Sequence, residues 1–188
     1  MARRKVERAT LFSATETLLI EQGYQGFHLK ALSERLKIGR STLYEYYASK
    51  EELITDYLVH MLDEIIEECS EIKKTDPIGQ LKEMLKIFLK YSQLHQIVLV
   101  IPFIDPHHSP KVEEALADLK RDHVLLYERI SRLIEEGKIE RAIRDDIETA
   151  VIAGMIFNAI QVPNVMQISE EKWSEKVLDI LFNGIGIK

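Results

Sequence analysis

The sequence predicts an all-α protein in which a three-helix N-terminal head, residues 1–50, precedes a larger helical body, residues 51–188, with about nine helices in total. Apolar residues recur at helical spacing through most of the chain, and the alternation typical of half-buried β-strands is absent. Glycine is sparse, at 8 of 188 residues, and helix start signals recur along the chain.

The head contains three predicted helices. The first is expected from about Lys5 to Gln22 and ends at Gly23, because glycine commonly terminates helices. A second helix is expected over Leu29–Leu36, and a short third over Arg40–Tyr46.

The body begins with a long helix whose start is marked by a capping box, Ser49 followed three residues later by Glu52. This helix is expected to end near Lys73. Asp76 and Pro77 provide the cap and the first position of a fifth helix, expected to end near His95.

The remainder of the body has one irregular stretch and three predicted helices. Three prolines interrupt residues 96–110, so a short helical piece followed by a loop is expected there. Helices are then expected over about 110–137, 145–161 and 169–183, opened by Ser109, Asp145 with Glu148, and Ser169.

The net charge of −6 alone argues against a nucleic-acid ligand, but its distribution reverses that argument. Residues 1–50 hold nine Lys or Arg against five Asp or Glu, a net charge of +4, which leaves −10 for residues 51–188. A basic head would be drawn to phosphates while an acidic body stays away from them. The charge pattern is therefore typical of a DNA-binding head with a separate regulatory body.

Three short helices at this spacing close a small core and leave one face of the third helix exposed, which is the geometry of a helix-turn-helix. Leu43 and Tyr47 are its expected inward anchors. The other face carries hydrogen-bond donors and flat rings, which are the side-chain types that contact base edges and phosphates: Arg40, Ser41, Thr42, Tyr44 and Tyr46. The pattern predicts binding to duplex DNA, with a solvated basic helical subdomain as the alternative.

Residues 10–55 resemble the N-terminal region of the TetR family of bacterial transcriptional regulators. The matching positions are Ala14, Leu18, Gly23, Tyr24, Leu32, Ile38, Thr42, Leu43, Tyr44, Tyr46, Tyr47, Ser49, Lys50 and Leu53. The rest of the chain resembles the family only in being helical and of similar length.

The resemblance implies roles for individual side chains of the third helix. Arg40, Ser41 and Thr42 would meet base edges or nearby phosphates. Tyr44 and Tyr46 would contact a phosphate or a thymine methyl group.

It also implies phosphate contacts around that helix. Lys50, at the start of the fourth helix, would hold a phosphate through its charge and the helix dipole. Weaker phosphate contacts are expected from His28 and Lys30. A basic arm could follow the backbone or the minor groove, and it consists of Arg3, Arg4 and Lys5.

The chain departs from the family pattern at four positions around the turn. Phe27 replaces the usual Thr, Lys37 the usual Gly, Gly39 a capping Ser, and Ser41 a frequent Gly. Lys37 is therefore expected in a left-handed conformation. Gly39 can still cap the third helix, less well than Ser by a few tenths of a kcal/mol.

Two body helices carry more apolar surface than one core needs. The helix over residues 147–160 is apolar nearly all round, so it must bury both sides. With the last helix it predicts a four-helix interface between two chains, as in TetR-like dimers, and the expected interface residues are Ile152, Ile156, Ile160, Trp173, Leu178 and Phe182. The alternative is a monomer with a deeply buried helix.

Inward stripes of apolar residues with a few polar groups predict a small-molecule pocket in the body. The expected lining residues are Tyr57, Met61, Phe88, His95, His123, Tyr127, Met155 and Asn158. His95 and His123 are singled out because an imidazole on an apolar stripe needs a partner. Plain core packing is the alternative for each.

No metal or cofactor is expected, because the spacing of the histidines matches no ligand pattern. The single cysteine, Cys69, excludes internal disulfides and lies among acidic residues that discourage a thiolate. No signal peptide or membrane span is expected, which favours the cytoplasm.

These observations favour a homodimeric transcriptional regulator, and by resemblance a repressor that a small apolar or amphipathic inducer releases from a palindromic operator. An enzyme using the body pocket is one alternative, although no catalytic motif accompanies it. A helical module that binds protein rather than DNA is the other.

Overall fold

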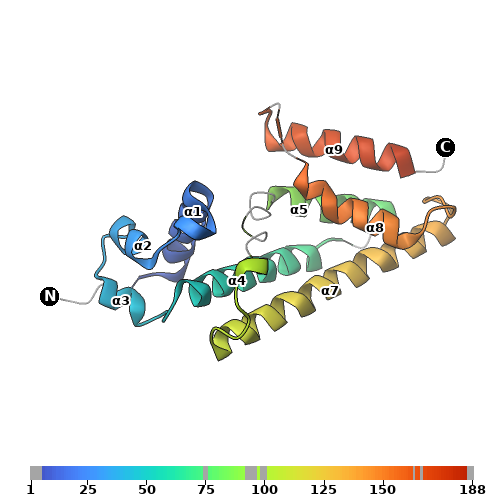
Figure 1. Ribbon diagram of the computed structural model, residues 1–188. Coiled ribbons are helices and arrows are strands. Elements are labelled where there is room, and N and C mark those ends of the chain that lie inside the picture. Colours follow the sequence, from blue (N-terminus) through green and yellow to red (C-terminus); the bar gives the residue numbers. More distant parts are fainter. Residues whose placement is uncertain are drawn as a thin grey trace. The chain divides into compact units, whose positions relative to one another are not determined.

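The computed structural model describes residues 6–73, 76–91, 97, 101–162, 164–165 and 167–185 (Figure 1). Within these ranges all regular structure is helical, as predicted: eight α-helices and two short 3-10 segments. The chain divides into two compact units. One contains residues 1–62 and 96–120, and the other contains residues 63–95 and 121–188. Helices α4 and α7 contribute residues to both units.

The first unit contains α1 (Arg8–Gly26), α2 (Leu29–Arg35), α3 (Arg40–Tyr44), the first turns of α4 (Lys50–Ser70), η1 (Ile101–Phe103) and the start of α7 (Pro110–Ile139). Helix α2 packs against both α1 and α3 (Figure 1). Apolar side chains from α1 to α4 form one buried core: Leu11, Phe12, Leu18, Leu19, Phe27, Leu29, Leu32, Leu43, Leu53, Ile54 and Tyr57.

The turn between α2 and α3 closes α2 with a Schellman motif. The amide of Ile38 donates to the Ser33 carbonyl at 3.0 Å, and the amide of Lys37 donates to the Glu34 carbonyl at 3.2 Å. Lys37 has φ 54°, so the expected left-handed conformation is confirmed. For a residue with a Cβ, that conformation costs roughly 1–2 kcal/mol of free energy, whereas glycine adopts it without this cost.

The second unit contains α5 (Pro77–Lys90), α8 (Thr149–Asn158), η2 (Ala159–Gln161) and α9 (Glu170–Ile185), together with the later turns of α4 and α7. Helices α8 and α9 pack against each other, and α9 also packs on α5 (Figure 1). The predicted cap of α5 is confirmed, since the Gly79 amide donates to Asp76 Oδ1 at 2.9 Å.

Several predicted boundaries were wrong. Helix α3 ends at Tyr44 rather than Tyr46, and α4 ends at Ser70 rather than near Lys73. Asp145 does not open α8, which begins at Thr149. The neighbouring Asp146 instead accepts a hydrogen bond from Arg144 Nε at 2.6 Å, which holds this stretch in a local turn. Helix α5 ends at Lys90 rather than near His95.

No helix within the described ranges has both the length and the apolar character that a membrane crossing requires.

Gly23 interrupts α1 with φ 66° and ψ 176°, a conformation open almost only to glycine. The break at Gly23 was predicted. We expect Gly23→Ala to lower the free energy of unfolding by about 1–3 kcal/mol, measured by chemical denaturation. No atom lies within 4 Å of the added Cβ, so the loss would be purely conformational.

Gly23→Asn is the matched comparison, because asparagine tolerates the left-handed helical region but not this one. It should be as destabilising as Gly23→Ala. A markedly milder effect of asparagine would mean that the backbone here is ordinary left-handed helix.

Candidate nucleic-acid interface

Helix α3 presents the predicted DNA-contacting side chains on its outer face. Leu43 is 1% exposed and anchors the helix in the core of the head, whereas Tyr44 is 55% exposed and Tyr46, just beyond the helix, 40%. Arg40 and Ser41 are also exposed, and Thr42 is half-buried. The exposed surface of α3, together with Tyr46 after it, therefore combines a guanidinium group, a hydroxyl and aromatic rings, as base and phosphate contacts require.

The connection between α3 and α4 is held by a carboxylate on α4. Tyr47 donates its hydroxyl to Asp56 Oδ2 at 2.5 Å, and Arg8 donates to Asp56 Oδ1 at 2.8 Å. Burial and the hydrogen bond to Asp56 raise the pKa of Tyr47 well above its usual value, so the phenol stays protonated. Asp56 was not predicted as part of the site, although it lies four residues after Glu52 and thus on the same helix face.

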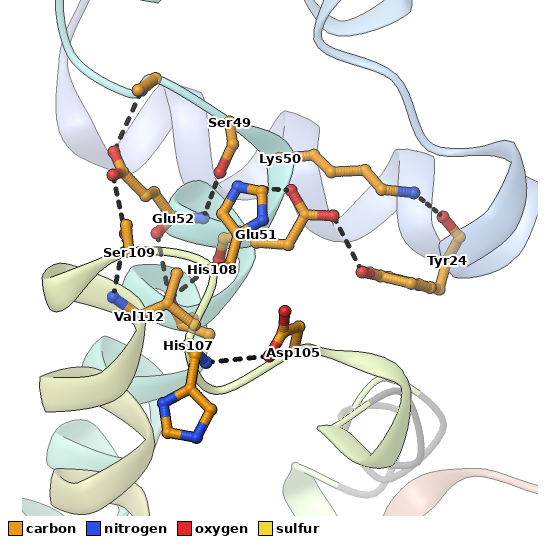
Figure 2. Close-up of polar contacts among 12 residues, drawn as sticks. Tyr24, Ser49, Lys50, Glu51, Glu52, Asp105, His107, His108, Ser109 and Val112 are labelled. Carbon is orange, nitrogen blue, oxygen red and sulfur yellow. Dashed lines mark hydrogen bonds and ion pairs between the residues drawn. The ribbon is translucent and has the colours of Figure 1, made fainter.

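The first turn of α4 is fastened to the end of α1. Lys50 Nζ donates to the Tyr24 carbonyl at 2.9 Å and lies 4.0 Å from the centroid of the Tyr24 ring (Figure 2). The Tyr24 hydroxyl donates in turn to Glu51 Oε1 at 3.0 Å. Burial, this hydrogen bond and the Glu51 charge raise the pKa of Tyr24 to about 12. Lys50, predicted to hold a phosphate, thus also has a structural partner within the head.

Two helix caps share one chain of hydrogen bonds (Figure 2). The Ala48 amide donates to Glu52 Oε2 at 3.0 Å, and the Ser109 hydroxyl donates to Glu52 Oε1 at 3.0 Å. Ser109 Oγ also accepts from the Val112 amide at 3.4 Å, and so caps α7 as predicted. The first turn of α4 is thereby bonded to the first turn of α7.

Glu52 can serve both caps because it is buried and stays charged. Its side chain is 7% exposed, and Lys111 Nζ lies 3.7 Å from Oε2. Burial raises the pKa of the Glu52 carboxyl, but the hydrogen bonds from Ala48 and Ser109 and the charge of Lys111 outweigh it, so the pKa is held below its usual value. A carboxylate that accepts several hydrogen bonds fixes the geometry of every donor around it.

A second contact joins α4 to the loop before α7. Nε2 of His108 lies 3.6 Å from Glu51 Oε2, an ion pair only when the imidazole is protonated (Figure 2). His107 does not face this carboxylate; its amide donates to Asp105 Oδ1 at 3.0 Å, which shapes the loop before α7.

Two of the weaker predicted DNA contacts lie at the start of α2. His28 and Lys30 are exposed at the start of α2, and Lys30 Nζ lies 3.9 Å from Glu34 Oε1. The predicted basic arm, Arg3, Arg4 and Lys5, lies outside the described residues.

Three predicted ligand contacts gather around one ring in the second unit. Phe157 of α8 stacks on Phe88 and Tyr127 at centroid distances of 5.7 and 5.8 Å, and lies 5.0 Å from the His123 ring. Phe157 itself was missed, although its place in the apolar run of α8 could have suggested it.

The other predicted ligand contacts do not form a shared cluster in the described residues. Tyr57 is buried in the head core and Met61 is half-buried on α4. Met155 is 50% exposed, and Asn158 is exposed and donates to the Gly154 carbonyl at 2.7 Å. His95 lies outside the described residues.

The predicted dimer contacts differ in how deeply they are buried within the single chain. Ile152, Ile156, Leu178 and Phe182 are buried within the single chain, whereas Ile160 and Trp173 are half-buried. The apolar side chains that α8 and α9 leave exposed are different ones: Val151 and Met155 at 50% and Ile180 at 77%. Both helices thus expose apolar side chains, and on α8 these lie about 100° around the helix axis from Ile152 and Ile156.

The described part of the chain was predicted to hold no metal site and no reactive thiol. No group of three His, Cys, Asp or Glu side chains among those residues is placed to hold a metal ion. Cys69 is buried, and burial raises the pKa of its thiol to about 11, which disfavours the reactive thiolate.

The head matches a known family. A family model described as bacterial regulatory proteins of the tetR family matches residues 11–57, which span α1 to the first turns of α4. A search of curated proteins by sequence returned no match.

Solved structures show the same fold along the whole chain. The ketosteroid transcriptional regulator KstR2 of Mycobacterium tuberculosis is 15% identical, with a TM-score of 0.81 over 100% of this chain and 99% of that one. The TetR family regulator PfmR of Thermus thermophilus is 16% identical, with a TM-score of 0.73 over 97% and 100%. AibR, solved with isovaleryl coenzyme A and operator DNA, is 15% identical, with a TM-score of 0.68 over 93% and 97%.

The shared caps can be tested with a double-mutant cycle. We expect Glu52→Ala and Ser109→Ala each to lower the free energy of unfolding by about 1–3 kcal/mol, because each removes a cap and a charge-assisted bond. The double variant should lose less than the sum, with a coupling energy of about 1 kcal/mol or more in urea denaturation.

Asp76→Ala, which removes the separate cap of α5, is the control. Its effect should add to that of Glu52→Ala. Strict additivity of Glu52→Ala and Ser109→Ala would show that the two caps are energetically independent.

Proposed function

We propose that the chain, whose residues 11–57 match the family model of bacterial regulatory proteins of the tetR family, is a ligand-responsive repressor that binds a palindromic operator as a homodimer. The family match of the head supports a DNA-binding regulator rather than an enzyme. We assign DNA binding to residues 1–50, and effector binding and dimerisation to residues 51–188.

The observation that carries this proposal is the outer face of α3. Leu43 fixes the helix in the core while Arg40, Tyr44 and Tyr46 remain exposed around it. A helix held rigidly from behind can enter a major groove without rearranging, and its side chains then reach base edges. The positive charge of the head supports the same assignment.

We propose that effector binding releases the operator through a displacement of α7. This helix carries His123 and Tyr127 beside Phe157, and its first turn is bonded to Glu52 through Ser109. An effector that binds near the aromatic cluster would favour one position of α7, and the shared caps would pass the displacement to α4 and the end of α3. The effector needs only a few kcal/mol of preference for the non-binding state to empty the operator.

A small apolar or amphipathic effector suits the aromatic cluster of Phe88, His123, Tyr127 and Phe157. The names of two similar structures support the same class, since one is a ketosteroid regulator and another was solved with isovaleryl coenzyme A. A ketosteroid and an acyl coenzyme A both combine an apolar body with polar groups.

DNA binding is tested by selecting duplexes from a random pool with the purified protein and measuring affinity for the recovered sequence. We expect Arg40→Ala or Tyr44→Ala to weaken specific binding by roughly 5- to 150-fold, because each removes a base or phosphate contact. Lys120→Ala, an exposed cation on α7, should leave affinity unchanged.

The alternative of a protein-binding module predicts a different outcome. No enriched duplex would emerge, and residual binding would not weaken steeply with salt. Full affinity of both α3 variants for the selected duplex would remove α3 from the interface.

The dimer is proposed to form on the exposed apolar side of α8 and α9. We expect Met155→Glu and Ile180→Glu to convert the dimer to a folded monomer, measured by sedimentation velocity, because both would bury an unpaired charge in the interface. Ile139→Glu, at an equally exposed position of α7, should stay dimeric.

The buried positions should behave differently. Ile156→Glu places a charge in the core of the chain and should lower the melting temperature rather than yield a folded monomer. Dimers that survive both Met155→Glu and Ile180→Glu would place the interface elsewhere.

A further inference from the structure

We propose that Lys37, in the turn between α2 and α3, is a phosphate-binding residue of the DNA interface. The inference rests on the proposed DNA-binding function and adds a contact that the third helix itself does not supply.

Most described cations of the head have a partner within the chain. Arg8 donates to Asp56 at 2.8 Å, Arg35 to Glu21 at 2.5 Å, and Lys50 to the Tyr24 carbonyl at 2.9 Å. Lys30 lies 3.9 Å from Glu34. Over residues 6–50, the two basic side chains with no such contact are Lys37 and Arg40.

These two cations lie at neighbouring points of the motif. Arg40 opens α3, and Lys37 is three residues before it, at the left-handed position that closes α2. Both side chains are exposed. The acidic residue nearest to Lys37 in the sequence is Glu34, and its Oε1 lies 3.9 Å from Lys30 Nζ. When α3 lies in the major groove, the turn that leads into it lies at the groove edge, where the phosphates are.

The backbone conformation at Lys37 supports a role for its side chain in contacting another molecule. Its conformation is one that glycine adopts without strain, and a glycine would also complete the Schellman motif. The lysine side chain forms no hydrogen bond or ion pair within residues 6–73 that would compensate. A long cation here is therefore unfavourable for the free protein but well placed for a phosphate.

The same backbone motif occurs once more with a cation. Arg141 follows α7 with φ 57°, its amide donates to the Lys138 carbonyl at 3.0 Å, and the Ala142 amide donates to Gly137 at 2.8 Å. Arg141 is exposed and lies outside the head. A basic residue with a left-handed backbone conformation therefore does not by itself indicate DNA binding. Arg141 provides a control with the same backbone strain and the same charge.

The experiment compares Lys37→Gly with Arg141→Gly in the full-length protein. Affinity for a fluorescent duplex recovered from a random pool is measured over a series of KCl concentrations, and thermal melting is measured without DNA. Both variants should melt about 2 °C higher than the parent, because each removes a strained side chain. Only Lys37→Gly should lose affinity, by roughly tenfold or more near 0.1 M salt.

The salt dependence identifies the contact. The slope of log K against log[KCl] should become shallower by about 0.9 for each head in Lys37→Gly, and should not change in Arg141→Gly. Because a phosphate contact carries no sequence information, the preferred duplex should remain the same. Lys37→Arg keeps the charge and should bind like the parent.

Two results would overturn the assignment. One is a parental affinity and slope in Lys37→Gly. The other is a lower melting temperature of Lys37→Gly beside a higher one of Arg141→Gly, since it would reveal a structural role for the lysine. Failure of the parent protein to bind any duplex would instead refute the proposed function itself.

Discussion

The arrangement of the head depends on one buried carboxylate. Glu52 accepts hydrogen bonds from the Ala48 amide and the Ser109 hydroxyl, both at 3.0 Å, while its side chain is 7% exposed. Ala48 belongs to the segment that leaves α3, and Ser109 begins α7. Breaking either hydrogen bond would leave a buried charged acceptor unsatisfied, which costs free energy. The end of α3 and the start of α7 are therefore expected to move together.

This constraint explains how a small helix can be both well placed and adjustable. Helix α3 spans Arg40–Tyr44, too short to hold its position by itself, and it is supported by Leu43 beneath it and by the Tyr47–Asp56 bond after it. Some exposed side chains around α3 form no hydrogen bond or ion pair within the described part of the head. Arg40 and Lys37 are cations of this kind, and phosphate or base contacts are what such cations favour.

Local signals predicted the helices, but not the contacts between distant segments. The caps at Ser49, Asp76 and Ser109 and the break at Gly23 follow from a few neighbouring residues and are confirmed. The bond between Glu52 and Ser109 joins residues 57 positions apart, and only the fold brings them together. An apolar run such as α8 likewise predicts burial but not which side faces the core, so Ile152 and Ile156 were expected at a dimer surface although they are buried within the chain.

The most direct test of the shared cap is hydrogen exchange at the Ala48 amide, followed by NMR in the parent protein and in Ser109→Ala. Without the Ser109 hydroxyl, Glu52 should hold Ala48 less tightly, and exchange of that amide should accelerate by roughly tenfold. The Gly79 amide, capped by Asp76 in α5, should exchange at an unchanged rate. An unaltered rate at Ala48 would show that the start of α7 does not constrain the end of α3, and would contradict the coupling on which this account rests.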